Sequence, residues 1–384
     1  MAPDSFKGCM SAGEACDAIR AGILRAAPDA AVYTFPLADG GEGTARAITC
    51  AAGGRFVKTR VTGPLGDMTE AEFGLIEGGR VAVLDMASAS GIELIGRERL
   101  NPMRATSYGT GELIAAALES GARELIIGIG GSATNDGGLG MLSALGFRAL
   151  DDRGQPLGQS PHSGGGEALA KIASIDTSAA DKRLGFVSIH AACDVTNPLL
   201  GPNGASAVFG PQKGATPEMV QLLDAGLARL ARAWIGAGLA ADTEQPGDGA
   251  AGGVGAALRI CLGAAMESGA MLVMRYSGFF SRLDNADLVI TGEGRTDGQT
   301  AAGKLCSVIA RESRKAKVPV ALLSGALGGD AAELALAYDY AVSIARGETS
   351  LDAMMANGER NLAFAAENVI RAIQIGIRSR AQHR

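Results

Sequence analysis

The sequence is poor in the residues that usually mark metal centres and disulfide frameworks. Its 384 residues include only three histidines and six cysteines, and no two cysteines are spaced as CxxC. A zinc site therefore finds no support in the sequence. Scattered thiols of this kind are typical of reduced cysteines in a cytoplasmic protein, and we expect that location.

Other absences disfavour whole classes of partner. No run of 18 apolar residues is present, so the sequence predicts no membrane span. No charged and then apolar leader precedes residues 3–8, so we expect no export signal. The formal net charge is −6, which disfavours nucleic acid as a partner. We expect a small-molecule substrate and a monomer or homodimer.

Glycine, in contrast, is abundant. The 56 glycines stand singly or in pairs between apolar segments, without a low-complexity tract. This distribution favours many tight loops between regular elements. The chain is longer than one typical hydrophobic core requires, which indicates two domains.

The two ends of the chain show the alternation of strands and helices that is typical of a parallel sheet. Near the start, Ser11 and Glu14 stand in capping-box spacing before an amphipathic helix that Pro28 ends. Further elements are expected at 31–35 (strand), 44–54 (helix), 286–294 (strand), 303–316 (helix), 318–325 (strand), 340–345 (strand) and 358–378 (helix).

The middle of the chain has a different pattern. Strands are expected at 55–63, 71–76 and 80–88, with a hairpin turn at 77–80. A helix, two strands and a long helix, with Thr216 as its cap, follow. We therefore predict an α/β fold in which a doubly wound sheet of five parallel strands, residues 1–57 and 285–384, contains an inserted mixed α/β domain of residues 58–284.

Polar residues follow the expected strands, where ligands bind in doubly wound sheets. Four loops combine acidic residues with glycines. Carboxylates suit magnesium, and glycine-rich backbone suits phosphate, so these loops favour a magnesium nucleotide. The polar residues are Asp4, Ser5, Lys7, Asp39, Glu293, Arg295 and Asp297, with Asp194 in the inserted domain.

The segment ELIIGIGGSATNDGG, residues 124–138, combines an apolar strand with a glycine-rich loop. Its glycines would let backbone N–H groups approach a phosphate, and a tight turn without a ligand is the alternative. Residues 128–133 also fit GxGxxA, with Asp151 at about the spacing of a dinucleotide site. That interpretation would indicate a nicotinamide-dependent dehydrogenase, although TNDGG stands where the helix of the motif should run.

Seven segments, in order along the chain, resemble the type I glycerate kinase family. They are APDSFKG, PLADGGEGT, TSYGTGELI, GIGGSATNDGG, CDVTNPLLGPNGASAVFGPQKGAT, GAAGGVGAAL and LVITGEGRTDGQTAAGK. The resemblance implies ATP-dependent phosphorylation of D-glycerate, usually at the 2-hydroxyl, with Mg²⁺. It also implies a discontinuous flavodoxin-like domain, an inserted domain resembling the restriction-endonuclease fold, and an active site in the cleft between them.

One departure from the family concerns the first strand. Members usually carry a short apolar strand before APDSFKG, whereas only Met1 stands there in this sequence. We therefore expect a truncated first strand, and an unstable sheet unless another segment fills the gap.

Within that family framework, Asp194 is the candidate base for the glycerate hydroxyl, with Lys7 as a second catalytic residue. A turn-capping role for Asp194 is the alternative. The candidate magnesium ligands are Asp39, Glu293 and Asp297, and loop hydrogen bonding is their alternative.

The remaining candidates would contact phosphate or glycerate. The nucleotide loop would use Gly130, Gly131, Ser132, Asn135, Gly137 and Gly138. Substrate binding would use Asp4, Ser5, Ser107, Lys213 and Arg295, and each cation among these could equally be an ordinary surface residue.

Overall fold

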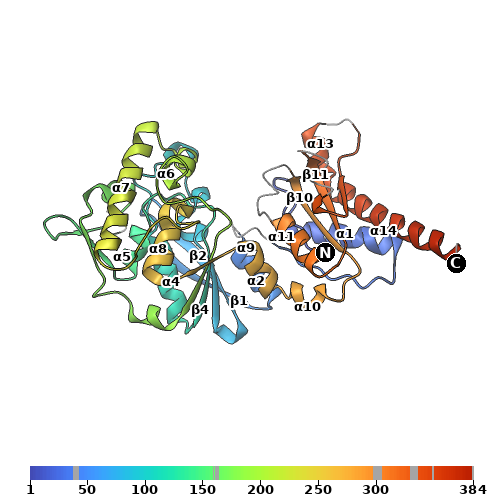
Figure 1. Cartoon of the computed structure of the whole chain (residues 1–384), viewed down its shortest axis with the longest axis horizontal. Helices are drawn as coiled ribbons and strands as arrows, with labels where there is room; N and C mark the ends of the chain where they lie inside the picture. Colours follow the sequence, from blue (N-terminus) through green and yellow to red (C-terminus); the bar gives the residue numbers. More distant parts are fainter. Residues whose placement is uncertain are drawn as a thin grey trace. The chain divides into compact units, whose positions relative to one another are not determined.

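The computed structural model describes residues 1–37, 43–158, 160, 164–296, 305–328, 336–347 and 350–382. The chain forms a mixed α/β structure with two compact units (Figure 1). Unit 1 combines Met1–Asp39 with Val273–Arg384, and unit 2 comprises Gly40–Leu272. Unit 2 is therefore an insertion in the sequence of unit 1.

The described part of unit 2 is built on a six-stranded sheet of order β1-β2-β3-β4-β8-β9. The first two pairs are antiparallel and the next three are parallel. Asp85, Gly128, Ala192 and Glu267 stand in one row, so the carboxyl ends of the parallel strands lie side by side. The strands are β1 Arg55–Thr62, β2 Met68–Ile76, β3 Val81–Asp85, β4 Glu124–Gly128, β8 Ser188–Ala192 and β9 Ala265–Glu267.

Side chains alternate between the two faces along each strand, and helices pack on both faces of this sheet. On one face, Leu125 and Ile127 share a core with Trp234 of α7 (Pro217–Gly236), whose side chain is fully buried. On the other face, Thr49 of α2 (Thr44–Ala51) lies against Gly74, where a Cβ would stand 1.7 Å from the Thr49 Oγ1. Only glycine allows α2 to approach the sheet so closely.

Shorter elements complete unit 2. The helices are α3 Ala87–Ser90, α4 Tyr108–Glu119, α5 Leu139–Ala144, α6 Ala205–Phe209 and α8 Val254–Leu262. A small antiparallel sheet, which the sequence pattern does not predict, contains β5 Arg148–Leu150, β6 Pro156–Leu157 and β7 Ser174–Asp176.

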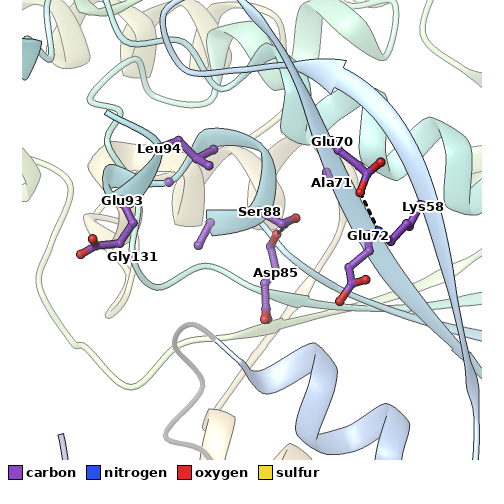
Figure 2. Close-up of a pocket in the computed structure, with 11 residues that line it drawn as sticks. Lys58, Glu70, Ala71, Glu72, Asp85, Ser88, Glu93, Leu94 and Gly131 are labelled. Carbon is purple, nitrogen blue, oxygen red and sulfur yellow. Dashed lines mark hydrogen bonds and ion pairs between the residues drawn. The ribbon is translucent and has the colours of Figure 1, made fainter. Parts of the chain in front are cut away.

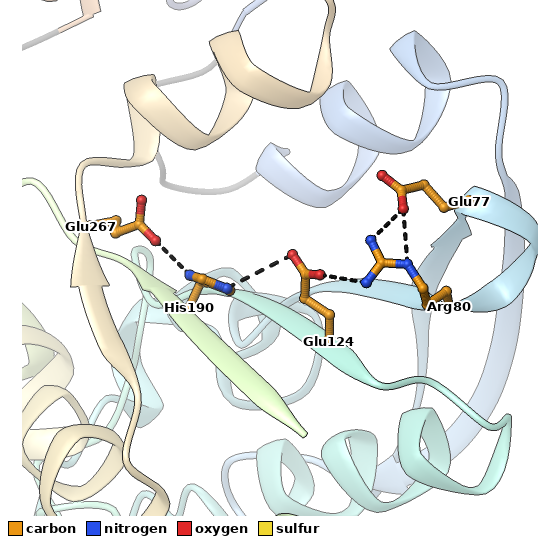
Figure 3. A network of polar contacts seen from close by, with 5 residues as sticks. All are labelled: Glu77, Arg80, Glu124, His190 and Glu267. Atoms are coloured by element: carbon orange, nitrogen blue, oxygen red, sulfur yellow. Dashed lines mark hydrogen bonds and ion pairs between the residues drawn. The ribbon is translucent and has the colours of Figure 1, made fainter. Parts of the chain in front are cut away.

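A chain of ionisable side chains crosses neighbouring strands of the large sheet (Figure 3). The Nδ1 of His190 lies 2.5 Å from the Glu267 Oε1, and its Nε2 lies 3.8 Å from the Glu124 Oε1. Arg80 donates to Glu124 at 2.9 Å and also pairs with Glu77. These contacts join the start of β3 to β4, β8 and β9.

In the described part of unit 1, three parallel strands form a sheet of order β10-β11-β12. Helices α1 and α14 pack on each other beside it (Figure 1). A Cβ at Gly22 of α1 would lie 2.0 Å from the carbonyl oxygen of Ala363, so glycine permits the close contact. The elements are α1 Ala12–Ala26, α10 Phe279–Leu283, β10 Val289–Thr296, α11 Leu305–Lys315, β11 Val320–Leu327, β12 Tyr340–Ser343, α13 Leu351–Ala356 and α14 Gly358–Gln382. Helix α9, Gly269–Tyr276, begins in unit 2 and continues into unit 1.

The first four residues extend the unit 1 sheet. The N–H groups of Ala2 and Asp4 each donate to carbonyl groups of β10 at 2.8 Å. The carbonyl groups of Met1 and Pro3 accept hydrogen bonds from residues 35 and 37 at 2.9 and 3.3 Å. The segments therefore follow the order 33–37, 1–4, β10, β11, β12. The loss of backbone pairing expected from a truncated first strand does not occur, because residues 1–4 are paired on both sides.

Two helix starts expected from the sequence are confirmed. Ser11 and Glu14 form a capping box at the start of α1. At the start of α7, the Thr216 Oγ1 accepts a hydrogen bond from the N–H of Met219 at 3.3 Å, and Pro217 is the first helical residue. Both caps provide partners for backbone N–H groups that the helix itself leaves unpaired.

The boundaries of the two units differ from those that the strand pattern indicates. The expected boundaries follow residues 57 and 284, whereas the units change after Asp39 and Leu272. The reason is that α2 packs on β2 and β3 of unit 2. The sequence shows that this helix is amphipathic, but not which sheet its apolar face covers.

None of the described helices is both long and apolar enough to cross a bilayer. All six cysteines are free thiols.

Candidate active site

The loop that follows β4 has an open tip and a buried stem. Gly130 is half-buried and Gly131 is exposed, with a φ of +71°. Every residue from Ser132 to Gly138 is buried. The backbone of the tip is therefore the part of this loop that a ligand can reach.

Asp136 organises the buried stem. Its side chain is fully buried, and its carboxylate accepts hydrogen bonds of 2.8 Å from both the N–H and the Oγ of Ser107. The N–H groups of Gly138 and Gly140 donate to it at 3.1 and 3.2 Å. Burial raises the pKa of Asp136, and these hydrogen bonds oppose the shift. The carboxylate thus joins the start of α5 to Ser107, the residue that precedes α4.

Lys213 supports the same loop through two hydrogen bonds. Its Nζ donates to the Ser132 Oγ at 2.8 Å and to the carbonyl oxygen of Thr134 at 2.6 Å. Only 2% of Lys213 is exposed. Burial lowers the pKa of Lys213 to about 7, and the negative charge of Asp136 opposes this shift. The predicted substrate residues Ser107 and Lys213 are thus brought together with Ser132 in the interior of unit 2.

The other predicted loop residues have packing roles in this structure. Asn135 donates from Nδ2 to the Ser206 Oγ at 3.0 Å, and its Oδ1 has no partner among the described residues. Gly138 has a φ of +73°, and a Cβ there would stand 2.6 Å from the Cβ of Ala257. Gly137 is similarly confined, because a Cβ would lie 2.4 Å from a Leu230 methyl group.

Asp194 is exposed beyond the end of β8. Its Oδ1 accepts a hydrogen bond of 3.1 Å from the N–H of Gly269, the first residue of α9. A carboxylate at this position satisfies a free N–H group of the helix and is favoured by the helix dipole. Asp194 therefore caps the start of α9, a role different from the local turn-capping alternative that the sequence suggests.

A pocket of about 280 Å³ lies beside the loop tip, within unit 2 (Figure 2). Gly131 lines it together with Asp85 and Ser88, and the Ser88 Oγ donates to the Asp85 carbonyl oxygen at 2.8 Å. Lys58 at its edge pairs with Glu70 at 2.7 Å. The remaining acidic lining residues are Glu72 and Glu93. Because four acidic residues and one lysine line the pocket, it suits a cation or hydroxyl groups better than an unaccompanied phosphate.

In unit 1, the segment that follows Asp4 lies against β10. A Cβ at Gly294 would stand 3.3 Å from the backbone nitrogen of Lys7, so residues 5–7 and the end of β10 are neighbours. The N–H of Ser5 donates to the Asp4 carboxylate at 2.6 Å. Lys7 and Arg295 are both exposed. Four predicted substrate or catalytic residues thus gather at one end of this sheet.

Glu293 is the described member of the predicted magnesium set, since Asp39 and Asp297 lie outside the described residues. Its Oε1 accepts a hydrogen bond of 2.9 Å from the Thr296 Oγ1, and 8% of Glu293 is exposed. Within the described ranges, no group of three histidine, cysteine or acidic side chains could hold a metal ion. Mg²⁺ usually takes only one or two carboxylates along with phosphate oxygens and water, so the donor chemistry of Glu293 fits it.

The dinucleotide interpretation of residues 128–133 conflicts with the local structure. That motif needs a helix that opens at its glycines, so that the helix N-terminus faces a pyrophosphate. Here α5 begins only at Leu139 and has six residues. Asp151 accepts hydrogen bonds from backbone N–H groups of its own turn, between β5 and β6.

Two acidic residues of unit 2, Asp136 and Asp85, are not among the residues that the sequence predicts for the site. Asp136 stands just before a glycine pair and a short helix, which is the usual place of an acid that accepts N–H groups of the first turn. Asp85 is the one acid in the run Val81–Asp85 and ends that strand. It accepts hydrogen bonds from the N–H groups of Gly43 at 2.9 Å and Ala45 at 3.1 Å, at the start of α2.

Comparison with known proteins agrees with the resemblance of the motifs. The sequence model of the glycerate kinase family matches residues 1–374. The chain is 45% identical to the glycerate kinase of Bacillus subtilis over 98% of this chain and 97% of the relative. It is 43% identical to the glycerate 2-kinase of Escherichia coli, over 99% and 98%. A crystal structure from Salmonella typhimurium LT2, provisionally described as glycerate kinase 2, superimposes with a TM-score of 0.86 at 44% identity and covers 98% of both chains. The chain therefore belongs to the glycerate kinase family.

Proposed function

We propose that this kinase transfers the γ-phosphoryl group of ATP to the 2-hydroxyl of D-glycerate, giving 2-phosphoglycerate and ADP. The observation that carries the proposal is the similarity over nearly the whole chain to glycerate kinases, one of which is named a glycerate 2-kinase. Phosphoryl transfer depends on positioning and on neutralising charge more than on covalent chemistry. The residues below are assigned roles of those two kinds.

Asp194 is our candidate for the base that accepts the proton of the attacking hydroxyl. Its exposure beyond a parallel strand and its hydrogen bond from Gly269 support the assignment, because the carboxylate is accessible and held in a fixed direction. A base must reach the proton that it takes, and a fixed carboxylate reduces the cost of that alignment.

The loop tip at Gly130 and Gly131 is our candidate for phosphate contact through backbone N–H groups. We assign the buried stem a supporting role. Ser132 is held by Lys213, and Ser107 is held by Asp136, so these side chains fix the backbone of the loop. Asn135, Gly137 and Gly138 are packed in the same stem and would act on phosphate only through the shape of the loop.

The exposed cations Lys7 and Arg295 are our candidates for contact with the γ-phosphate or the glycerate carboxylate, and Asp4 and Ser5 would orient Lys7. Glu293, with Asp39 and Asp297, would hold Mg²⁺. When bound, Mg²⁺ neutralises phosphate charge during the transfer.

We further propose that unit 1 is flavodoxin-like and that unit 2 resembles the restriction-endonuclease fold. The pairing of residues 1–4 with both residues 33–37 and β10 supports the first assignment, since a flavodoxin-like sheet has the strand order 2-1-3-4-5. The second rests on the family resemblance and on the mixed sheet of unit 2.

ADP release with D-glycerate, ATP and Mg²⁺ tests the proposal, with L-glycerate and glycerol as control acceptors. We expect one ADP for each phosphorylated glycerate, and NMR of the product should show coupling between phosphorus and the proton on carbon 2. Coupling to the carbon 3 protons would change the assigned hydroxyl. An absence of ADP with D-glycerate would overturn the proposed activity altogether.

A further inference from the structure

A second polar pocket lies in unit 1 beyond the end of β12. It has a volume of about 500 Å³, and loop residues 346–347 and helices α13 and α14 line it. None of its lining residues belongs to the candidate active site. The lining residues are Arg346, Gly347, Ala353, Met354, Asn357, Arg360 and Asn361.

The charged residues that line this pocket are both arginines. Arg346 and Arg360 line it, and no acidic residue does so. Among the described residues, neither arginine has an ion-pair partner. The Arg346 guanidinium lies over the ring of Phe364, 4.2 Å from the ring centroid. Stacking supports one flat face of the guanidinium and leaves the N–H groups on its edge available to an acceptor.

Helix α14 adds polar groups beside these charges. Asn361 is only 9% exposed, and its side chain makes no hydrogen bond with a described residue. Arg360 and Asn361 follow Asn357 by three and four positions, so the three lie on one side of the helix start. The Nδ2 of Asn357 donates to the Ala353 carbonyl oxygen at 2.8 Å, which fixes this side chain at the pocket wall.

We propose that this pocket is a second, non-catalytic binding site for a phosphate-bearing small molecule. Two guanidinium groups and a carboxamide donor match the charge and the acceptor oxygens of a phosphate dianion. The volume exceeds what a bare phosphate needs and falls within the usual range of metabolite sites. A phosphorylated organic acid and a nucleotide both carry this group. They differ in the rest of the molecule, which the pocket must also accommodate.

Calorimetric titration of the full chain tests the proposal. The probes are inorganic phosphate, 2-phosphoglycerate and ATP without Mg²⁺, and citrate serves as a carboxylate anion. The variant is Arg346→Gln combined with Arg360→Gln. Its matched control is Arg378→Gln, an exposed arginine of the same helix that does not line the pocket.

For at least one phosphate probe, we expect the wild type and Arg378→Gln to show a binding event that the double variant weakens by about tenfold or more. Turnover of D-glycerate without added effector should stay within about twofold, since the pocket holds no proposed catalytic residue. A pocket-dependent event with 2-phosphoglycerate alone would identify an organic acid phosphate as the source, and one with ATP alone would identify a nucleotide.

Identical titrations of the wild type and the double variant would overturn the proposal, as would pocket-dependent binding of citrate without phosphate. Circular dichroism and thermal melting establish that the double variant is folded. If it is not, the side-chain Nε–H NMR signals of the wild-type arginines during a phosphate titration decide the matter. The signals assigned to Arg346 and Arg360 should shift at saturation, and a spectrum in which neither shifts excludes the site.

Discussion

The Lys213 Nζ and the Ser132 Oγ lie 2.8 Å apart in the interior of unit 2, directly behind the glycine-rich loop. A lysine in such a place loses the hydration that stabilises its charged form, and its pKa falls to about 7. Unfolding returns the side chain to water, where its pKa is about 10.4. The stability of unit 2 should therefore depend on pH through this one residue.

Lys213→Met should remove part of that dependence. Between about pH 7 and pH 10 the unfolded chain binds more protons at Lys213 than the folded protein does. The free energy of unfolding of the wild type should consequently rise with pH, by up to about 1.4 kcal/mol per pH unit from this group. Urea unfolding at several pH values, followed by the fluorescence of Trp234, measures the slope. Parallel pH profiles of wild type and variant would contradict the prediction.

Asp136→Asn should destabilise unit 2. The carboxylate accepts four hydrogen bonds in a fully buried site, and an amide nitrogen would face donors at one of its positions. We expect the free energy of unfolding to fall by about 2–4 kcal/mol. Asp152→Asn, at an exposed position, is the control and should be neutral. Equal urea midpoints for the two variants would mean that Asp136 does not organise the loop.

Two glycines of the same loop should respond differently to alanine. At Gly138 a Cβ would stand 2.6 Å from Ala257, so Gly138→Ala should cost more than about 2 kcal/mol of stability. At Gly131 the nearest atom would be 3.2 Å away, and the cost should be about 1–2 kcal/mol for its left-handed backbone. Gly131→Ala should nevertheless weaken ATP binding, because its backbone forms the tip. Unchanged ATP affinity in a folded Gly131→Ala variant would rule out phosphate contact there.

Asp194→Asn separates catalysis from capping. The asparagine side chain keeps an oxygen that can accept the hydrogen bond from Gly269, so α9 should stay intact. If Asp194 is the base, kcat should fall by about 100-fold or more while the KM for glycerate changes little. Asp194→Ala, which also loses the cap, should melt at a lower temperature than Asp194→Asn. Turnover of Asp194→Asn within a few-fold of the wild type would leave Asp194 with the capping role alone.

Local patterns in the sequence predicted the local structure well. The capping box of Ser11 and Glu14 and the cap at Thr216 depend on neighbouring residues only, and both are present. The roles of the glycines in the glycine-rich loop could not be predicted. A glycine can be required by a positive φ, by close packing or by the approach of a phosphate, and the sequence does not distinguish these three reasons. At Gly137 and Gly138, the positive φ and the close packing together explain the glycine. Only the three-dimensional contacts show this, since Leu230 and Ala257 are distant in the sequence.

The role of Asp136 was hidden for a similar reason. Its position before α5 could have been recognised locally, but its strongest partner, Ser107, comes from a different helix start. The packing of α2 on one face of the sheet also depends on Gly74, which lies in β2 and is distant from α2 in the sequence. Such pairings are set by the tertiary fold rather than by periodicity.

The hydrogen bond from the N–H of Ala2 to the carbonyl of Ile290 has a consequence for synthesis on the ribosome. Residues 1–4 can pair with residues 33–37 early in synthesis, but their other sheet partner, β10, is made only after the whole of unit 2. At about 5–20 residues per second, the N-terminal segment therefore lacks its β10 partner for about 10–50 seconds. Unit 2, a continuous segment, can fold during that interval. Limited proteolysis of nascent chains stalled near residue 310, where unit 2 has left the ribosome tunnel and β10 has not, should therefore find unit 2 protected and residues 1–37 open to cleavage.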